Sequence, residues 1–283
     1  MGSNSFRADD GIMIYEFVKA TLAEDVGRGD LYARVLKPSM ASAKIVAKSD
    51  GVLAGELYCN ALCELEGLHV TWHIKDSQSF KKGDILAEIK ADSHSLLKTE
   101  RTFLNMLLHA SSIATLTNRY VELIKPYGTK LLDTRKTRPM LRSFEKYATR
   151  TGGATNHRMG LDDSLMLKDT HLKTIENLSE FMQNARKNIP FTCKIEIEAE
   201  TFDQAKEFMA VGADIVMCDN MTPSQLSEVV RYRDENHSSV LLEASGNITL
   251  ETIESYAKTG VDAISSGSLI HQANWIDLSM KVQ

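Results

Sequence analysis

The stretch CKIEIEAE at 193–200, followed by a helix-like stretch at 202–211 and then by DIVMCDN at 214–220, decides the fold. Strand–helix–strand alternation of this kind predicts parallel strands joined by right-handed crossovers. The same rhythm extends in both directions along the chain. The further apolar runs are KLLDT at 130–134, SLMLKD at 164–169, VLLEASG at 240–246 and DAISSGS at 262–268. Six such units favour a closed or nearly closed α/β barrel over an open sheet.

The first part of the chain has a different pattern. Short β-type segments (SAKIVAKS, VTWHIK and DILAEIK) lie between residues 41 and 90, with a helix-like stretch at 57–65 between them. An amphipathic helix is expected at 12–25 and a long, mostly helical segment at 95–125. The segments DGVLAGE and KKGDILAEI resemble half of a biotinyl or lipoyl hammerhead. No lysine stands in a hairpin turn between matching halves, so a β-rich mixed domain is the better interpretation.

Composition excludes several classes of protein. The chain has 283 residues, a net charge of −5, 43% hydrophobic and 25% charged residues, which are ordinary globular values. An acidic protein is a poor candidate for nonspecific binding to nucleic acid or membrane surfaces. No apolar run approaches the roughly 18 residues that span a bilayer. The stretch MGSNSFRADD at 1–10 has no apolar core, so it is expected to be a disordered leader and not a signal peptide.

Cysteine usage is typical of a reduced compartment. Four cysteines in a chain of this length are not a disulfide framework. Cys59 and Cys63 are four residues apart in a helix-like stretch, and Cys193 and Cys218 lie in runs expected to be strands. We therefore expect buried small hydrophobic side chains and a cytoplasmic protein.

Polar residues end each of the six apolar runs. In a parallel α/β barrel, functional side chains gather at the carboxyl ends of the strands. The polar and charged residues at these ends include Arg135, Lys136, Lys168, Asp169, His171, Glu196, Glu198, Asp219, Glu243, Ser245 and Ser266. The repetition favours a site over a merely solvated rim.

The charge is unevenly distributed. Eight Lys or Arg lie between Lys130 and Arg158, opposed only by Asp133 and Glu145. A solvated helix face would account for Arg142, Lys146 and Arg150. It does not account for the cations beside strands and a glycine turn, which are Arg135, Lys136, His157, Arg158 and Lys168. Arginine binds carboxylate or phosphate with a planar fork, so these five predict a multiply anionic small ligand.

The other side of the rim has a complementary chemistry. Glu198 and Asp219 stand beside SGN and SGS turns, and a glycine next to a serine lets backbone N–H groups approach a phosphate closely. Carboxylates that face a phosphorylated ligand need a cation or hydroxyl groups between them, and Mg²⁺ with a sugar diphosphate supplies both. The residues thus predict a site with a polycarboxylate half and a phosphosugar half.

The stretch LLDTRKTRPMLRSFEKYATRTGGATNHRMGLDDSLMLKDTHL at 131–172 resembles the core of the quinolinate phosphoribosyltransferases. The resemblance continues in EDVGRGD, TERTFLN, IEIEAET, VMCDNM, LLEASGNI and SSGSLIH, in order along nearly the whole chain. It implies an N-terminal, hammerhead-like α/β sandwich over 1–113, an open seven-stranded α/β barrel over 114–272, and a segment 273–283 that packs back on the N-terminal domain. The implied reaction converts quinolinate and phosphoribosyl pyrophosphate to nicotinate mononucleotide, pyrophosphate and CO₂ in de novo NAD synthesis.

The resemblance also implies roles for matching residues. Lys136, Glu198 and Asp219 are the expected catalytic residues, with Mg²⁺ near the two carboxylates. Quinolinate would be held by Thr134, Arg135, His157, Arg158 and Lys168, and by Arg101 from the partner subunit of a homodimer. Phosphoribosyl pyrophosphate would contact Lys136, Glu198, Asp219, Ser245, Gly246, Asn247, Gly267, Ser268 and His271. The resemblance leaves open whether the dimers assemble further into a hexamer of dimers.

This chain departs from the family pattern at a few positions. Arg138 and Met140 stand where small residues are usual, and Asn247 stands where glycine is usual. A nicotinate phosphoribosyltransferase or a molybdate-linked paralogue would need fewer carboxylate-binding cations than this chain has. A non-catalytic phosphosugar-binding barrel would not need both Glu198 and Asp219. A role in nucleic-acid binding would depend on the basic stretch alone, which offers only Phe144 and Tyr147 for stacking.

Overall fold

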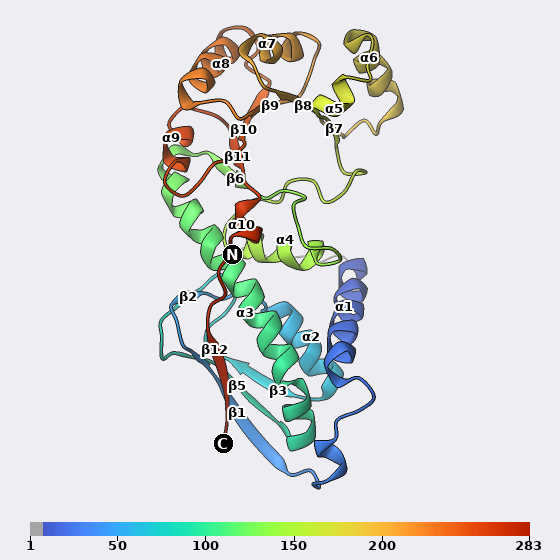
Figure 1. Cartoon of the computed structure of the whole chain (residues 1–283), viewed down its shortest axis with the longest axis vertical. Helices are drawn as coiled ribbons and strands as arrows, with labels where there is room; N and C mark the ends of the chain where they lie inside the picture. The colour runs from blue at the N-terminus through green and yellow to red at the C-terminus, as the bar shows by residue number, and fades with distance from the viewer. Residues whose placement is uncertain (1–7) are drawn as a thin grey trace. The chain divides into compact units, whose positions relative to one another are not determined.

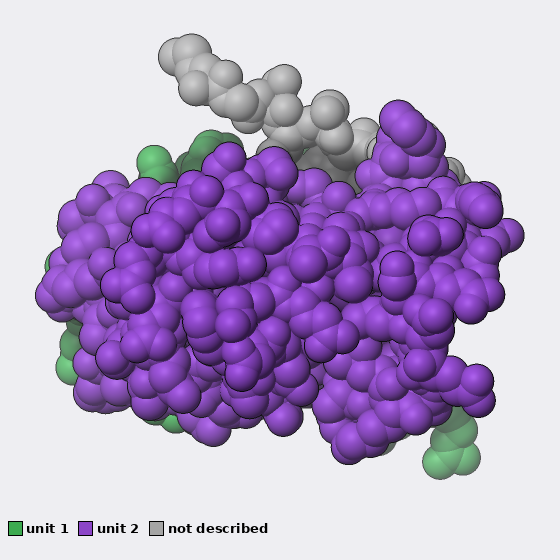
Figure 2. Space-filling view, turned by 90° about the horizontal axis from the view of Figure 1, so that it is seen from above, with its two compact units in different colours: residues 1–115, 273–283 green, residues 116–272 purple. Residues whose placement is uncertain are grey.

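The computed structural model describes residues 8–283. The first seven residues of the predicted leader lie outside this range, and a helix begins at Ala8. The chain forms two compact units, which Figure 2 distinguishes by colour: Met1–Thr115 with Ala273–Gln283 form unit 1, and Leu116–Gln272 form unit 2. Among the described residues, no helix has both the length and the apolar character needed to cross a bilayer.

Unit 1 is built on a four-stranded antiparallel sheet in the order β12-β1-β5-β3. Along β1 the residues Ala43, Ile45 and Ala47 are buried, and the residues between them are more exposed, which is the period of a sheet with one packed face. The strands are β1 (Met40–Ala47), β3 (His69–Trp72), β5 (Ile85–Asp92) and β12 (Leu278–Val282), and a separate pair is formed by β2 (Gly51–Val52) and β4 (Ser79–Phe80).

Three helices and a 3-10 turn accompany this sheet. They are α1 (Ala8–Val26), η1 (Tyr32–Arg34), α2 (Glu56–Glu66) and α3 (Ser93–Ile124), of which α3 continues into unit 2. Cys59 and Cys63 are buried in α2 as free thiols, and burial raises the pKa of Cys63 to about 12. The prediction of buried small hydrophobic residues is confirmed for these two and for Cys218. It is wrong for Cys193, which is partly exposed and precedes its strand instead of lying in it.

Unit 2 contains a six-stranded, wholly parallel sheet in the order β6-β11-β10-β9-β8-β7. Each of the six predicted apolar runs contains one of its strands. They are β6 (Lys130–Leu132), β7 (Leu165–Leu167), β8 (Ile195–Ala199), β9 (Ile215–Asp219), β10 (Leu241–Ser245) and β11 (Ala263–Ser265). The first strand of unit 2 in chain order, β6, lies beside the last, β11. The sheet curls into an open barrel, with its gap between the edge strands β6 and β7 (Figure 1).

The fold class is confirmed, with one difference in the strand count. Six strands are paired in this sheet within the described residues, whereas seven were expected. The additional segment is the chain at Thr155, which forms a single parallel bridge with Leu132 on the outer edge of β6. The segment makes one bridge only, so it does not count as a seventh strand.

Helices α7, α8 and α9 lie on the outer side of the curved sheet (Figure 1). Two helices are capped shortly after a strand: the Thr201 and Thr222 hydroxyls accept from backbone N–H groups of Gln204 and Gln225. Each glutamine side chain bonds back to the threonine backbone, a reciprocal cap that starts the helix sharply. The helical segments are η2 (Lys125–Tyr127), α4 (Arg142–Thr151), α5 (Asp169–Leu172), α6 (Leu178–Asn188), α7 (Phe202–Ala210), α8 (Pro223–Asn236), α9 (Ile253–Ala257) and α10 (Ser268–His271).

Strand periodicity positions the site. In β8 the residues Ile195, Ile197 and Ala199 belong to the hydrophobic core, so Glu196 and Glu198 face the opposite side, the interior of the barrel. The polar residues of the sequence motif therefore line the barrel interior.

Candidate active site

A cavity of about 340 Å³ lies in unit 2 at the carboxyl ends of the strands. It is lined by Thr134, Arg135, Lys136, His157, Arg158, Met166, Lys168, Glu198, Met217, Asp219, Ser245 and Ser265. All three predicted catalytic residues and all the predicted quinolinate ligands of unit 2 are in this set. The structure thus brings together the cationic and acidic residues that the sequence places at separate strand ends.

Three lining residues were missed by sequence reasoning, namely Met166, Met217 and Ser265. Met166 lies on β7 two positions before Lys168, and Met217 lies on β9 two positions before Asp219. Because alternate residues of a strand share a face, this spacing was the signal that could have identified them. The two methionines add an apolar surface beside the charged groups.

The remaining predicted residues lie elsewhere. Gly246, Asn247, Gly267, Ser268 and His271 follow β10 and β11 but do not line the cavity. The Ser268 hydroxyl is buried and bonded to the hydroxyls of Ser266 and Tyr120. Arg101 is exposed on α3 in unit 1.

Two arginines dominate the cationic side. The Arg158 guanidinium donates from Nη1 to the Ser164 carbonyl at 2.9 Å and from Nη2 to the Met166 sulfur at 3.4 Å. Burial and the nearby Arg135 charge lower the pKa of Arg158. Arg135 has a buried Nη1 without a protein partner among the described residues. Converging cations with an unused donor are suited to a ligand that carries several negative charges.

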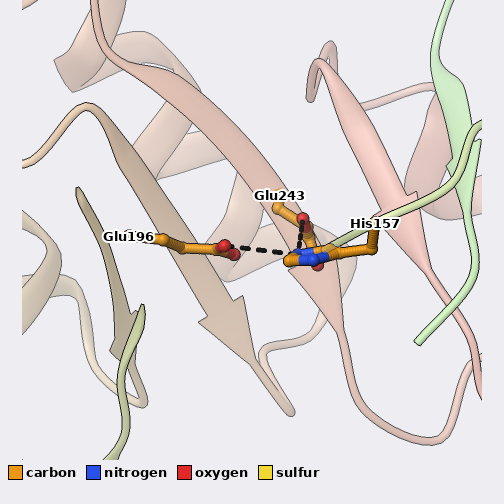
Figure 3. Close-up of side chains that lie close together, drawn as sticks. All are labelled: His157, Glu196 and Glu243. Carbon is orange, nitrogen blue, oxygen red and sulfur yellow. Dashed lines mark ion pairs between the residues drawn. The ribbon is translucent and has the colours of Figure 1, made fainter. Parts of the chain in front are cut away.

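His157 lies between two buried glutamates (Figure 3). Its Nε2 is 3.2 Å from Oε2 of Glu196 on β8 and 3.3 Å from Oε2 of Glu243 on β10. Burial alone would lower the pKa of His157, but the hydrogen bonds to the two carboxylates outweigh it and raise the pKa to about 10. The Arg158 backbone N–H points at Nδ1 at 2.7 Å and favours the neutral ring. Both forms of the ring keep a hydrogen on Nε2, facing the carboxylates.

The same three side chains are a potential ligand set for a metal ion. The carboxylate oxygens stand at hydrogen-bond distance from Nε2, and the raised pKa of His157 makes a proton a strong competitor at that nitrogen. We therefore interpret the group as an ion-pair cluster.

The basic stretch is corrected at Lys146. A solvated helix face was expected for Arg142, Lys146 and Arg150, but Lys146 is 1% exposed and pairs with the fully buried Asp133. Asp133 also accepts from the Thr149 hydroxyl, the Asn156 amide and the His157 backbone. The periodicity of α4 was right, but its lysine faces inward because a buried carboxylate of the preceding loop compensates its charge.

The departures at Arg138 and Met140 lie outside the cavity. Arg138 pairs with the buried Glu145 of α4 through both its guanidinium and its backbone N–H. Met140 is 95% exposed at φ 65°. Arg138 therefore has a structural partner within its own loop–helix segment.

The acidic side carries Glu198 and Asp219. The Lys168 ammonium donates to Oε1 of Glu198 at 2.8 Å, which links the two sides of the cavity. Oδ2 of Asp219 accepts from the Asn220 amide at 2.9 Å, and Oδ1 of Asn220 accepts from the Asn247 amide at 3.0 Å. Carboxylate oxygens are the ligand type that Mg²⁺ uses, commonly one or two of them together with substrate phosphates.

Two glycines allow close approach next to these residues. Gly246 has φ +95°, and a Cβ there would lie 2.3 Å from Oδ1 and 2.8 Å from the backbone N of Asn220. A Cβ on Gly267 would lie 2.9 Å from Cδ of Lys136 and 3.4 Å from the Thr134 hydroxyl. Gly246 requires glycine because of its positive φ and the Asn220 backbone beside it, whereas a side chain on Gly267 would displace Lys136.

Comparisons with known proteins find similar proteins over nearly the whole chain. Models of the quinolinate phosphoribosyl transferase N-terminal and C-terminal domains match residues 30–111 and 113–281. A probable nicotinate-nucleotide pyrophosphorylase (carboxylating) of Synechocystis is 37% identical over 274 residues, 96% of this chain and 93% of the relative. One from Bacillus subtilis is 38% identical over 92% of this chain and 90% of its own length. The structure of the Francisella tularensis nicotinate-nucleotide pyrophosphorylase has a TM-score of 0.90 at 34% identity, covering 96% of this chain and 97% of that one.

Proposed function

Because the chain belongs to the quinolinate phosphoribosyltransferase family, we propose that the unit 2 cavity transfers phosphoribosyl from phosphoribosyl pyrophosphate to quinolinate with decarboxylation. The products are nicotinate mononucleotide, pyrophosphate and CO₂, a step of de novo NAD synthesis. One observation carries the assignment: a single cavity of about 340 Å³ is lined by Arg135, Arg158 and Lys168 together with Glu198 and Asp219.

The cationic side is the proposed quinolinate half. Arg135, Arg158 and Lys168 bind the adjacent carboxylates, with Thr134 and His157 completing the wall. The buried Nη1 of Arg135 has no partner within residues 8–283, which supports this role because a ligand carboxylate would satisfy it. Lys168 pairs with Glu198 in the free site, so quinolinate must compete with Glu198 for its ammonium group.

The acidic side is the proposed phosphoribosyl half. Glu198 and Asp219 accept from ribose hydroxyls, and Lys136 binds the phosphorylated substrate. Ser245, Gly246, Asn247, Gly267, Ser268 and His271 surround the 5′-phosphate in this proposal. The absence of a Cβ at Gly246 and Gly267 supports it, because backbone N–H groups then stay accessible to a phosphate.

Chemistry in this site depends on positioning and charge. The pyridine nitrogen attacks the anomeric carbon while pyrophosphate leaves, and positive charge develops on the ribose. Glu198 and Asp219 stabilise that charge, which exists mainly in the transition state. The ribosylated pyridinium stabilises the electron pair left on C2 when the 2-carboxylate departs as CO₂, and C2 then takes up a proton from solvent. No side chain forms a covalent bond, so holding the two substrates in line supplies much of the rate.

Mg²⁺ is the proposed metal cofactor. Glu198 and Asp219 would hold it together with the pyrophosphate group, and it would neutralise the charge of the leaving group.

A cytoplasmic location is proposed from the four free cysteines, three of which are buried.

A homodimer is the proposed assembly, in which Arg101 reaches the quinolinate site of the partner subunit. The position of Arg101 on an exposed face of α3 leaves its guanidinium accessible to another subunit.

The test of the function is quinolinate-dependent release of CO₂ in the presence of phosphoribosyl pyrophosphate and Mg²⁺. Release should depend on all three additions and yield nicotinate mononucleotide. Nicotinate in place of quinolinate is the control, and the cationic wall predicts that it is a much poorer substrate. Equal use of nicotinate would contradict the proposal.

A further inference from the structure

Two buried glutamates lie beneath the cavity and have no part in the mechanism above. Glu196 and Glu243 are 1% and 2% exposed and do not line the cavity. Each stands two positions before a lining residue on its strand, Glu196 before Glu198 and Glu243 before Ser245. They therefore face the barrel interior one layer deeper than the site.

His157 connects this buried layer to the cavity. The imidazole lines the cavity, and its side chain is 11% exposed. Its Nε2–H faces both carboxylates, as Figure 3 shows. The backbone N–H of His157 is held separately by Oδ1 of Asp133 at 2.8 Å. Ring and backbone of this residue are thus fixed from two directions.

The connection continues to Arg158. The Arg158 backbone nitrogen lies 2.7 Å from Nδ1 of His157, to which its N–H donates when the ring is neutral, and the Arg158 carbonyl accepts from the Lys146 ammonium at 3.3 Å. These contacts set the backbone from which the Arg158 guanidinium extends into the cavity. A displacement of the imidazole would therefore move the arginine that we assign to quinolinate.

We propose that Glu196 and Glu243 are positioning residues for the dicarboxylate half of the site, and that they act through His157 on Arg158. The inference rests on the proposed function, since it concerns quinolinate binding. Two charge-assisted hydrogen bonds hold the imidazole in one orientation, and neutral partners would hold it less firmly. Glu196 also places negative charge near Arg158, which the Arg135 charge repels.

The experiment measures dicarboxylate binding without catalysis. Glu196→Gln and Glu243→Gln keep the side-chain shape and remove the charge. Binding of quinolinate, and of phthalate as a vicinal dicarboxylate without ring nitrogen, is measured by isothermal titration calorimetry. Each variant should bind both ligands about tenfold more weakly, by analogy with the partners that orient metal ligands, whose loss typically costs about 10- to 100-fold. In steady-state assays KM for quinolinate should rise while KM for phosphoribosyl pyrophosphate stays within about twofold, since the second half is untouched.

A double-mutant cycle tests whether the effect passes through His157. In a His157→Ala background, Glu243→Gln should weaken phthalate binding by less than about twofold, because the connection is already removed. A full additional loss in that background would overturn the inference, as would unchanged affinity in the single variants.

The matched control is Asp262→Asn. Asp262 precedes β11 at the opposite end of the sheet and accepts from Arg233 and from the Leu242 backbone. This variant should lower the melting temperature and leave dicarboxylate binding unchanged. If the wild-type protein binds neither ligand, the proposed function fails; if it binds both and the glutamine variants match it, only the inference fails.

Discussion

Arg158 is the residue on which the proposed quinolinate half depends most directly. Its guanidinium is oriented by the Ser164 carbonyl and the Met166 sulfur, so its position does not rely on the ligand. Arg158→Ala should lower kcat/KM for quinolinate about 100-fold, which corresponds to about 2.7 kcal/mol and the loss of charged hydrogen bonds. Binding of phosphoribosyl pyrophosphate, measured by calorimetry, should stay close to the wild-type value.

Arg186→Ala is the matched control for this prediction. Arg186 pairs with Asp214 before β9, at the amino end of the sheet. Its removal should leave the kinetics with both substrates unchanged. An equal loss for the two substrates in Arg158→Ala would show that the residue supports the whole site and not its dicarboxylate half.

His157 gives the second prediction at this scale, a dependence of stability on pH. Its pKa is about 10 in the folded protein and 6.5 in the unfolded chain. The charged ring therefore contributes stability that is fully present below pH 6.5 and is lost as pH rises through 10. The difference in free energy of unfolding between wild type and His157→Gln, measured in urea, should shrink over that window. A constant difference would mean that the Arg158 amide at Nδ1 keeps the ring neutral.

At the scale of elements, the turns after β9 and β10 are built as one piece. Asn220 follows β9, and its backbone N donates to the Ser245 carbonyl of β10 at 2.9 Å. Gly246 packs against the same asparagine. Gly246→Ala should raise KM for phosphoribosyl pyrophosphate and lower stability by about 1–3 kcal/mol, because its Cβ would displace Asn220 and with it Asp219. Thermal unfolding and steady-state kinetics measure the two effects.

Gly212→Ala separates backbone strain from displacement. Gly212 has φ +90°, and a Cβ there would have no atom within 4 Å. This variant should lose stability for the same conformational reason and keep its KM values. If both variants alter KM alike, the loss at Gly246 reflects general destabilisation and not the close approach to Asn220.

The local sequence pattern predicted an element best where the whole element is buried. The six strands of unit 2 were predictable because strands covered on both faces appear as short apolar runs. β12 was not predicted as a strand although LSMKV alternates apolar and polar residues, since so short a run gains its register only by pairing with β1. Lys146 was misjudged because its partner Asp133 lies in another element. The His157 cluster was missed for the same reason: its three residues come from three segments.

Across the whole molecule, the net charge of −5 conceals a local excess of cations. The structure shows which cations the two local acids balance, because Lys146 and Arg138 pair with Asp133 and Glu145. The cations that remain beside the cavity are those assigned to substrates. An acidic protein with a basic cavity excludes large polyanions while it admits small ones.

The shared site is the prediction that belongs to the assembled protein. Arg101→Ala and Lys168→Ala should each be nearly inactive alone. In a dimer of one chain of each kind, the site with native Lys168 receives native Arg101 from its partner, and the other site lacks both. Random exchange of equal amounts should therefore restore about a quarter of wild-type activity, because half the dimers are mixed and each has one complete site.

The mixture is assayed after subunit exchange has been verified by native mass spectrometry with an isotope-labelled chain. Mixing Arg101→Ala with wild type is the control. The activity of this mixture should not exceed the activity of the wild-type chains that it contains. If Arg101 served its own subunit, every site in the mixed dimer would lack one of the two residues, and no recovery would follow. Verified exchange without recovery therefore assigns Arg101 to its own chain and removes the reason for an obligatory dimer.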